Sequence, residues 1–352
     1  MRKLKILING RILTHEVQSG VEEYAKNLTK SLFETADCEK IEFKIVKPDC
    51  NNTIYQHFWE HFILPFIAKE YDILFCPTGL LPLFLSKKTK TIVMIHSLAF
   101  KVLPHNYSKL FRFYYTLMTW FITKKATFVL TPSKSEMDSI IKHYPDVKEK
   151  IAFIHHGVSH KFHFNPKNGR ENYILFVGTL SKIKNIKMVI EAFWRIREKV
   201  NIELKIVSPK TNIFKLSKEK KAIIEKALKD KHIKFIHNVS KNDLILLYQK
   251  AKLFLFPSHY ESFGKPPVEA MSCGTPVIIS NRASLPEVCQ KAAVYIDPDN
   301  IDELVLASIL ILKNSSLQKK LQRLGLQQSQ HYKWDTVAKK YIKIFLKVGE
   351  CK

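Results

Sequence analysis

Residues 253–279 read LFLFPSHYESFGKPPVEAMSCGTPVII, and this stretch decides the fold. Leu253–Phe256 is a short continuous apolar run, which is typical of a strand buried in a parallel sheet. A polar loop follows, and Pro266 then favours the first turn of a helix, where a missing N–H costs nothing. Gly274 marks the end of that helix and Val277–Ser280 the next strand. This order predicts one strand–helix–strand unit of a parallel α/β sheet.

Two carboxylates lie in this unit, Glu261 in the loop and Glu269 in the expected first helical turn. Gly264 lets the backbone of the loop approach a ligand closely. A helix N-terminus attracts anions, and open α/β sheets bind ligands at the carboxyl ends of their strands. We therefore predict a phosphate-bearing ligand whose hydroxyls donate hydrogen bonds to the carboxylates. The alternative is an ordinary crossover unit with surface carboxylates.

Length and charge set the class of protein. The chain has 352 residues, which predicts two domains. Its 57 Lys and Arg outnumber 32 Asp and Glu, for a formal net charge of +25. This excess predicts acidic partners: nucleic acid, an anionic membrane surface or phosphorylated substrates. The six cysteines form no CxxC pair, so we expect reduced thiols in a cytosolic compartment.

From the apolar runs of the sequence we expect neither a targeting segment nor a membrane-spanning one. The N-terminal MRKLKILING is too short in apolar residues for a signal peptide. No run approaches the ~20 apolar residues that a spanning helix needs. We therefore expect a soluble or peripheral protein. Strands and helices alternate throughout, and the polar stretch His160–Glu171 is the best linker candidate.

The segment 107–125, YSKLFRFYYTLMTWFITKK, predicts an unusual helix that is apolar and aromatic nearly all round. Such a helix is either buried in a core or in contact with lipid. Aromatic residues next to basic ones are also the composition of an interfacial anchor. Both interpretations stay open, but Arg112 and the flanking lysines leave too short an apolar run to span a membrane.

Two groups of histidines could suggest a metal site. One group lies in an apparent hinge, but no carboxylate or cysteine completes a ligand set around His155, His156, His160 and His163. The other pair, His57 and His61, is one helical turn apart but does not form His-Glu-x-x-His. We expect no metal at either group, and surface or packing roles for the pair.

The run from Glu261 to Glu269, ESFGKPPVE, together with the following CGTPV, resembles the signature of glycosyltransferase family 4, the retaining group 1 transferases. This resemblance implies an α/β protein of GT-B fold, with two Rossmann-like α/β/α domains whose parallel sheets face each other across a deep cleft. The expected domains are an acceptor-binding domain over 1–165 and a nucleotide-sugar-binding domain over 166–332. Residues 333–352 would form a helix that crosses back onto the first domain, anchored by Trp334.

The resemblance also assigns residues. Lys184 and the amides around Gly264 would hold the donor diphosphate, and Glu269 would accept hydrogen bonds from the ribose. Glu261 and His96 are the expected catalytic residues, both in contact with the transferred sugar. The full expected donor set is Lys184, Ser262, Phe263, Gly264, Lys265 and Glu269, and the N-terminal loop could add Ser19 and Gly20. No metal or other cofactor is implied, because the chain has no Asp-x-Asp motif and a basic cleft would take the place of a cation.

Several positions depart from the family pattern. Ser19 replaces a glycine, Ser97 replaces the aspartate after His96, and Ile183 stands where an arginine is usual. A lysine binds phosphate as a point charge, so the bidentate arginine contact is lost and Lys182 is a possible substitute. His96 could instead merely cap its strand, and Lys184 could be a solvated surface charge.

The implied reaction is transfer of a hexose with retention, with GDP-mannose the favoured donor and a UDP-sugar possible. A saccharide or lipid-linked saccharide acceptor of surface polysaccharide or lipopolysaccharide synthesis would suit the charge and the aromatic helix. That acceptor places the protein in the cytoplasm, at the cytoplasmic face of an anionic membrane. The alternatives are a basic nucleic-acid-binding α/β protein, which we do not expect because no RNA-binding signature occurs, or a sugar-nucleotide epimerase.

Overall fold

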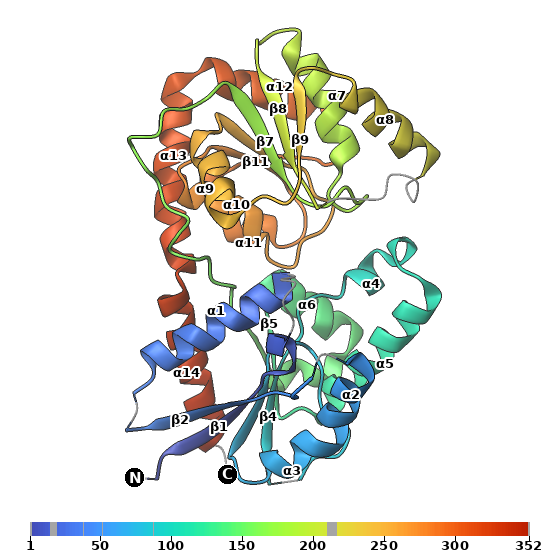
Figure 1. Ribbon diagram of the computed structural model, residues 1–352, viewed down its shortest axis with the longest axis vertical. Helices are drawn as coiled ribbons and strands as arrows, with labels where there is room; N and C mark the ends of the chain where they lie inside the picture. Colours follow the sequence, from blue (N-terminus) through green and yellow to red (C-terminus); the bar gives the residue numbers. More distant parts are fainter. Residues whose placement is uncertain are drawn as a thin grey trace. The chain divides into compact units, whose positions relative to one another are not determined.

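The computed structural model describes residues 2–14, 20–37, 39–50, 52–86, 88–209 and 217–350. Two compact units make up the chain (Figure 1). The first contains Met1–Gly157 and Lys333–Lys352, and the second contains Val158–Tyr332. Each unit has a parallel sheet flanked by helices, which confirms the α/β architecture predicted from the alternation of strands and helices.

The first unit contains a parallel sheet of six described strands in the order β2-β1-β3-β4-β5-β6. The strands are β1 (Leu4–Asn9), β2 (Ile41–Val46), β3 (Ile73–Cys76), β4 (Lys90–Met94), β5 (Phe128–Thr131) and β6 (Ile151–Phe153). The chain passes from β1 to β2 on one side and then to β3 on the other side of β1. The topological switch point of this sheet therefore lies between β1 and β3, where open α/β sheets bind ligands.

Helices pack on both faces of this sheet. They are α1 (Gly20–Thr35), α2 (Thr53–Phe58), α3 (Leu64–Ala68), α4 (Ala99–Val102), α5 (Lys109–Lys125), α6 (Lys134–His143) and α14 (Trp334–Glu350). The helix α14 comes from the end of the chain and packs beside α1 (Figure 1). The two hydroxyls of Tyr24 and Tyr341 lie 2.6 Å apart at this contact. The ring of Trp334 fits against Gly157, where an added Cβ would come within 2.2 Å of Trp334 Cδ2.

The helical segment between β2 and β3 is not one continuous helix. A π-helical turn, Trp59–Ile63, separates α2 from α3. Pro65 explains the interruption, because it has no N–H to donate to the carbonyl of His61 and its ring would clash with that carbonyl. A wider turn before the proline avoids this clash, and such π-helical turns are frequent at functional sites.

The second unit contains another parallel sheet of six described strands, in the order β12-β11-β10-β7-β8-β9. Its strands are β7 (Tyr173–Val177), β8 (Glu203–Val207), β9 (Ile233–Ile236), β10 (Leu253–Phe256), β11 (Val277–Ser280) and β12 (Val294–Ile296). Its helices are α7 (Ile186–Arg197), α8 (Lys218–Leu228), α9 (Lys241–Lys250), α10 (Lys265–Ser272), α11 (Leu285–Cys289), α12 (Ile301–Lys313) and α13 (Ser315–Ser329). The strand order is that of a dinucleotide-binding sheet, and its switch point lies between β7 and β10.

The aromatic segment at 107–125 forms α5, which begins after Ser108, whose hydroxyl accepts a hydrogen bond from the Phe111 N–H at 3.2 Å. The structure excludes the core interpretation, because the buried residues of α5 are Thr119, Ile122 and Thr123. Its outer face exposes a row of large apolar side chains: Leu110 (78%), Phe113 (70%), Leu117 (45%) and Trp120 (49%). No helix of the described residues is long and apolar enough to cross a membrane.

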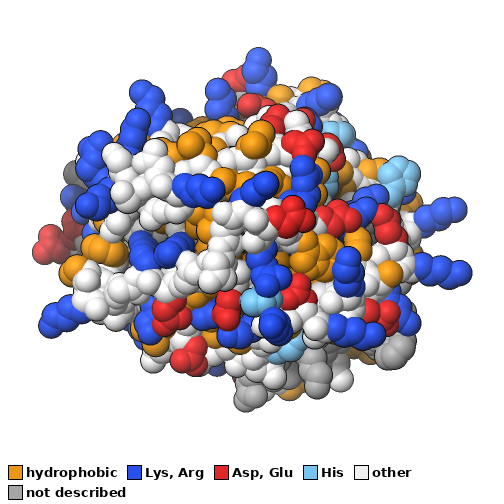
Figure 2. Space-filling model, turned by 90° about the horizontal axis from the view of Figure 1, so that it is seen from above, with side chains coloured by type: hydrophobic (Ala, Val, Ile, Leu, Met, Phe, Trp, Pro, Cys, Tyr) orange, Lys and Arg blue, Asp and Glu red, His pale blue; other side chains and the backbone are white. Residues whose placement is uncertain are grey.

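The positive charge is not gathered into one patch on the face that Figure 2 shows. Lys and Arg side chains are spread across that face, and Asp and Glu side chains lie between them. Many of the lysines form exposed ion pairs, such as Lys234 with Glu203 at 2.9 Å and Lys250 with Glu171 at 2.9 Å. Such pairs contribute little stability and indicate a solvated surface.

Candidate functional site

The candidate site of the second unit lies where two loops follow adjacent strands. One loop runs from β7 to α7 and the other from β10 to α10, at the two sides of the switch point. The backbone N–H of His259, in the second loop, donates to the carbonyl of Ile183, in the first, at 2.8 Å. The two loops are thereby fixed to each other, although they are far apart in sequence.

Lys184 and Glu261 meet at this junction. Lys184 Nζ lies 2.5 Å from Glu261 Oε1, and the ammonium group also lies 5.0 Å from the ring centroid of Phe256. Both side chains are largely shielded, with 22% of Lys184 and 11% of Glu261 exposed. The Ser284 hydroxyl donates to the Glu261 carbonyl at 2.8 Å, which fixes the loop backbone. The structure thus brings a cation and a carboxylate into one partly buried pair.

The backbone after Glu261 depends on glycine. Gly264 precedes α10 with φ +91°, a left-handed conformation that favours glycine. An added Cβ there would come within 2.5 Å of Leu285 Cδ2. The helix begins at Lys265, so Pro266 and Pro267 occupy its first turn and supply no N–H groups. Gly264 and Lys265 are therefore the residues at this helix start whose backbone carries an N–H group.

Glu269 lies deeper than the sequence suggests. α10 begins at Lys265, so Glu269 falls just beyond its first turn. The side chain lies on the packed face of the helix and is 5% exposed. The Tyr248 hydroxyl donates to Glu269 Oε2 at 3.2 Å, and Lys265 Nζ lies 3.5 Å from Glu269 Oε1. The lysine therefore turns along the helix toward the glutamate. Contact between Glu269 and a ribose stays a prediction.

The two residues between Glu261 and Gly264 differ in what they present. Ser262 is half-buried, whereas Phe263 is 3% exposed. The Phe263 ring packs edge-on against Tyr332, with ring centroids 5.5 Å apart. Phe263 therefore anchors the loop in the core, and only its backbone can face a ligand.

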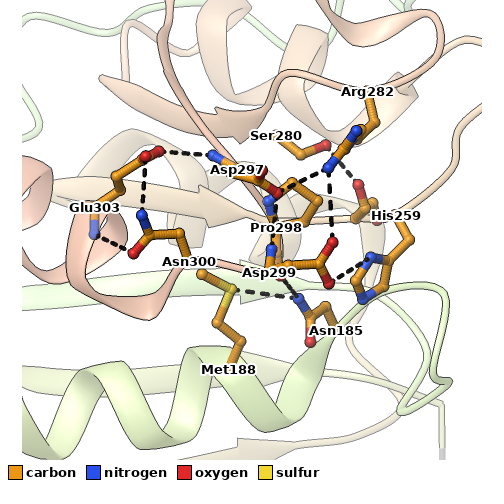
Figure 3. A network of polar contacts seen from close by, with 11 residues as sticks. Asn185, Met188, His259, Ser280, Arg282, Asp297, Pro298, Asp299, Asn300 and Glu303 are labelled. Carbon is orange, nitrogen blue, oxygen red and sulfur yellow. Dashed lines mark hydrogen bonds and ion pairs between the residues drawn. The ribbon is translucent and has the colours of Figure 1, made fainter.

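A network of polar contacts joins the loops that follow neighbouring strands of the second sheet (Figure 3). Asn185 Nδ2 donates to the Pro298 carbonyl at 2.7 Å, which ties the loop after β7 to the loop after β12. Arg282 Nη2 lies 3.0 Å from Asp297 Oδ1 and 3.6 Å from Asp299 Oδ2. The ring of His259 faces Asp299 as well, with Nδ1 3.8 Å from Oδ1. Loops that follow four strands are thus held together, a set of contacts that sequence reasoning missed.

His96 follows β4 in the first unit. Its Nε2 donates to the Pro77 carbonyl at 2.7 Å, and its ring lies edge-on to Tyr24, with centroids 4.8 Å apart. Burial lowers the pKa of His96 to about 4, although the Pro77 carbonyl opposes this shift, so the imidazole is neutral at pH 7. Its Nδ1 is buried and has no hydrogen-bond partner among the described residues. The ring is therefore held inside its unit by Nε2.

The structure also places Ser97 and Gly20, two further residues that the sequence analysis considers. The Ser97 hydroxyl, where the family has an aspartate, accepts a hydrogen bond from the Ala99 N–H at 3.1 Å. Gly20 is the first residue of α1, and no heavy atom would lie within 4 Å of an added Cβ there. Ser19 lies outside the described residues. Within the residues that the structure describes, no group of three or more His, Cys, Asp and Glu could hold a metal ion.

A second polar centre, in the first unit, was not found from the sequence. Asn9 Nδ2 donates to Glu60 Oε1 at 2.6 Å, and Arg11 Nε lies 3.3 Å from Glu60 Oε2. Glu60 is fully buried and lies on the π-helical turn. Burial raises its pKa, against the lowering effects of Arg11 and Asn9. The one feature of the sequence that could have pointed to this centre is the carboxylate of Glu60, which stands alone within the aromatic run from residue 58 to residue 62.

Two family models match the chain in succession. Residues 30–162 match a model described as "Glycosyltransferase Family 4", and residues 159–328 match "Glycosyl transferases group 1". Among curated proteins, the O-antigen chain mannosyltransferase RfbU of Salmonella typhimurium is 37% identical over 190 residues. This match covers 53% of the chain and spans about half, 51%, of that relative.

Solved structures resemble the whole chain at low sequence identity. The sucrose-phosphate synthase of Thermosynechococcus elongatus has a TM-score of 0.76 at 17% identity, with 98% of this chain and 99% of that chain covered. The Anabaena protein Alr3699/HepE, solved in complex with UDP and glucose, has a TM-score of 0.74 at 16% identity. This match covers 98% of this chain and 100% of that chain. At such identities the likeness establishes the fold.

Proposed function

The chain belongs to the group 1 glycosyltransferases of family 4 and has their GT-B fold, and from this we propose that it transfers a hexose from a nucleotide diphosphate sugar to an acceptor hydroxyl. The transfer retains the anomeric configuration of the donor. The donor binds at the switch point of the second sheet. The acceptor is a saccharide or a lipid-linked saccharide.

The Lys184–Glu261 pair is the observation that carries this proposal. A lysine ammonium binds phosphate oxygens, and a carboxylate accepts hydrogen bonds from hydroxyls. Because Lys184 Nζ and Glu261 Oε1 are 2.5 Å apart, a ligand that satisfies both groups carries a phosphate and a hydroxylated ring in close succession. A sugar bonded to a diphosphate has this arrangement, whereas inorganic phosphate or an isolated sugar satisfies only one of the two groups.

The roles in the transfer follow from these positions. Lys184 and the amides of Gly264 and Lys265 stabilise negative charge that develops on the diphosphate as the glycosidic bond breaks. Glu261 orients the sugar through its hydroxyls, and Glu269 accepts from the ribose. His96 contacts the sugar. Because Nε2 donates to the Pro77 carbonyl, Nδ1 carries no proton in this tautomer, and a sugar hydroxyl would donate its hydrogen bond to Nδ1.

GDP-mannose is the donor that we favour. The support is the O-antigen mannosyltransferase of Salmonella, whereas the Anabaena protein solved with UDP and glucose supports a UDP-sugar. The first relative also supports an acceptor in surface polysaccharide synthesis. The absence of a cofactor requirement remains part of the proposal, with Lys184 supplying the charge that a metal ion would otherwise bring.

We further propose that the protein works at the cytoplasmic face of a membrane. The exposed row on α5 carries large apolar side chains, and basic residues flank it at Lys109, Arg112, Lys124 and Lys125. Aromatic side chains settle at the level of lipid headgroups, and lysine and arginine are attracted to anionic lipids. A lipid-linked acceptor would be presented at that surface.

The decisive experiment is a screen of the full chain for thermal stabilisation by UDP, GDP and dTDP and their sugars, because selective binding to the folded state raises Tm. The best donor is then used for transfer to a saccharide acceptor, and NMR of the product gives the anomeric configuration. We expect stabilisation by GDP-mannose and a product with the donor's configuration. Absence of stabilisation by any nucleotide, or an inverted product, contradicts the proposal.

A further inference from the structure

The first unit contains a cavity of about 360 Å³ at the switch point of its own sheet. Its wall is built from residues that directly follow three strands: Arg11 after β1, Thr78 after β3 and His96 after β4. One side of the remaining wall is formed by Tyr107 and the inner face of α5, and residues of α1, α4 and the loop after β3 complete it. Ligands of open α/β sheets bind at this position in the fold, so the cavity is placed to receive one.

The α5 side of the cavity presents a stack of aromatic rings. The ring centroids of Tyr107 and Phe111 are 5.3 Å apart at 17°, and those of Phe111 and Tyr115 are 4.3 Å apart at 29°. All three residues line the cavity. An aromatic face packs well against the C–H face of a pyranose ring, because the electron-rich ring attracts the weakly positive C–H groups. The cavity therefore offers a platform for a sugar ring.

Arg11 supplies the polar side of the cavity and is held in place from behind. Its Nε lies 3.3 Å from Glu60 Oε2, and its backbone N–H donates to Asn9 Oδ1 at 3.1 Å. Asn9 Nδ2 closes the network by donating to Glu60 Oε1 at 2.6 Å. Glu60 is fully buried on the π-helical turn, so its carboxylate contacts Arg11 and Asn9 and is shielded from solvent. The ion pair with Glu60 lies on the Nε side of the guanidinium, and Nη1 lies 3.5 Å from the ring of His57, so Nη2 is the terminal amino group that the described residues leave for another acceptor.

Charge decides what kind of ligand fits. The buried carboxylate of Glu60 offsets the charge of Arg11, so the pair is close to neutral as seen from the cavity. Burial also lowers the pKa of His57, whose ring nitrogens lie 3.5 Å from Arg11 Nη1, and that of the adjacent His61. Neither histidine adds positive charge at pH 7. The positive charge that would attract a phosphate is therefore reduced, whereas the hydrogen bonds that the guanidinium can donate to neutral hydroxyls are not affected.

We infer that this cavity binds a neutral hexopyranose of the acceptor, with the sugar ring stacked on the Tyr107–Phe111–Tyr115 rings and its hydroxyls accepting hydrogen bonds from Arg11. Glu60 acts through Arg11 as a positioning residue. The inference rests on the proposed function, since it names the acceptor's chemical class. It also assigns a role to the π-helical turn, which places Glu60 behind the arginine.

The test uses saturation-transfer NMR on the full chain with methyl α-D-mannopyranoside as the probe. The nucleoside diphosphate that stabilises the protein most is present in excess to occupy the donor site. Arg11→Lys keeps the charge but loses the planar fork of donors. We expect it to weaken probe binding by about tenfold, the effect of losing a hydrogen bond from a charged group. Arg2→Lys is the matched control, because Arg2 pairs with Asp72 away from the cavity.

Two further variants separate a specific role from damage to the fold. Phe111→Leu removes one ring of the stack and should also weaken probe binding, while Glu60→Gln should do so by freeing Arg11 to move. All variants should keep the thermal shift caused by the nucleoside diphosphate. Unchanged probe binding in Arg11→Lys and Phe111→Leu, or no probe signal from the wild-type protein, overturns the inference. If the nucleoside diphosphate does not raise the Tm of the wild-type protein, that result would instead contradict the proposed donor site.

Discussion

Lys184 Nζ lies 2.5 Å from Glu261 Oε1, at the switch point of the second sheet. The two side chains come from loops that follow adjacent strands, and the carbonyl of Ile183 and the N–H of His259 join these loops at 2.8 Å. With both partners largely shielded from solvent, the pair is stronger than a surface ion pair. Each ion nevertheless keeps capacity for a ligand, since the carboxylate has further lone pairs and the ammonium further protons.

Replacing Glu261 by Gln should abolish most transfer without abolishing donor binding. The amide is a weaker acceptor for sugar hydroxyls, so we expect transfer to fall by about a hundredfold, measured as kcat with the best donor. The Kd of the nucleoside diphosphate should be unchanged or lower, because Lys184 loses its competing partner. Glu171→Gln, an exposed carboxylate paired with Lys250 in the same unit, is the control. Full transfer by Glu261→Gln would remove Glu261 from the site.

Replacing Lys184 by Gln should act on donor binding first. Loss of a charged hydrogen bond to the diphosphate is expected to raise its Kd by about 10- to 100-fold, measured by calorimetry. Lys187→Gln serves as the comparison, since Lys187 lies on the same segment but pairs with Glu219 on the surface. Equal affinities for the two variants would show that Lys184 is a solvated charge.

Gly264 should not tolerate alanine. The added Cβ would overlap with Leu285, and φ +91° strains any residue with a side chain. We expect the free energy of unfolding to fall by about 1–3 kcal/mol, measured by urea denaturation. Gly169→Ala is the matched variant, because no heavy atom would lie within 4 Å of its Cβ. A Gly264→Ala protein as stable as Gly169→Ala would contradict the described loop.

Stability should depend on pH through His96. Its folded pKa of about 4 lies below the ordinary value of 6.5, so the unfolded chain binds the proton more readily between these pH values. The folded protein therefore loses stability as pH falls, by up to about 2 kcal/mol between pH 6.5 and pH 5. His96→Gln should lose that part of the pH dependence.

The pKa of His57 and of His61 is lowered as well, so the difference between wild type and His96→Gln isolates the single residue. The surface variant His143→Gln provides the comparison. Unfolding free energies at pH 5 and pH 7 give the measurement. Parallel pH profiles for wild type and His96→Gln would show that the ring is not buried as described.

The outer face of α5 should mediate binding to anionic vesicles. Phe113→Ser with Trp120→Ser removes two exposed aromatic side chains, so binding to phosphatidylglycerol vesicles should weaken by about tenfold or more. Leu306→Ser with Leu310→Ser is the control, because these exposed leucines lie on α12 in the second unit. Binding by the wild type should also weaken with added salt. Equal vesicle binding by the two double variants would exclude this face.

Local patterns in the sequence predict much of the second unit. The apolar run of β10, the prolines that open α10 and the strand β11 lie where the composition places them. The burial of Glu269 is the instructive difference, because tertiary packing decides which face of α10 is covered, and the local sequence does not.

The environment of α5 could not be predicted from its own residues. The helix is apolar on two faces, and hydrophobic periodicity cannot tell which face the rest of the unit covers. Packing against the sheet buries Thr119, Ile122 and Thr123 and leaves Phe113 and Trp120 outside. The π-helical turn between α2 and α3 could not be predicted from the sequence either, although Pro65 gives its physical cause.

The sequence by itself determined the α/β class, the strand and helix order and the residue types of the donor loops, because these depend on local periodicity and backbone chemistry. Only the tertiary structure decided that Lys184 pairs with Glu261 and that Arg11 pairs with Glu60. In both pairs the two residues lie on segments that follow different strands. Which of these segments are neighbours depends on the order of the strands in the sheet, and local sequence patterns do not give that order. Burial then fixes these contacts, because a buried charge without its partner would cost several kcal/mol.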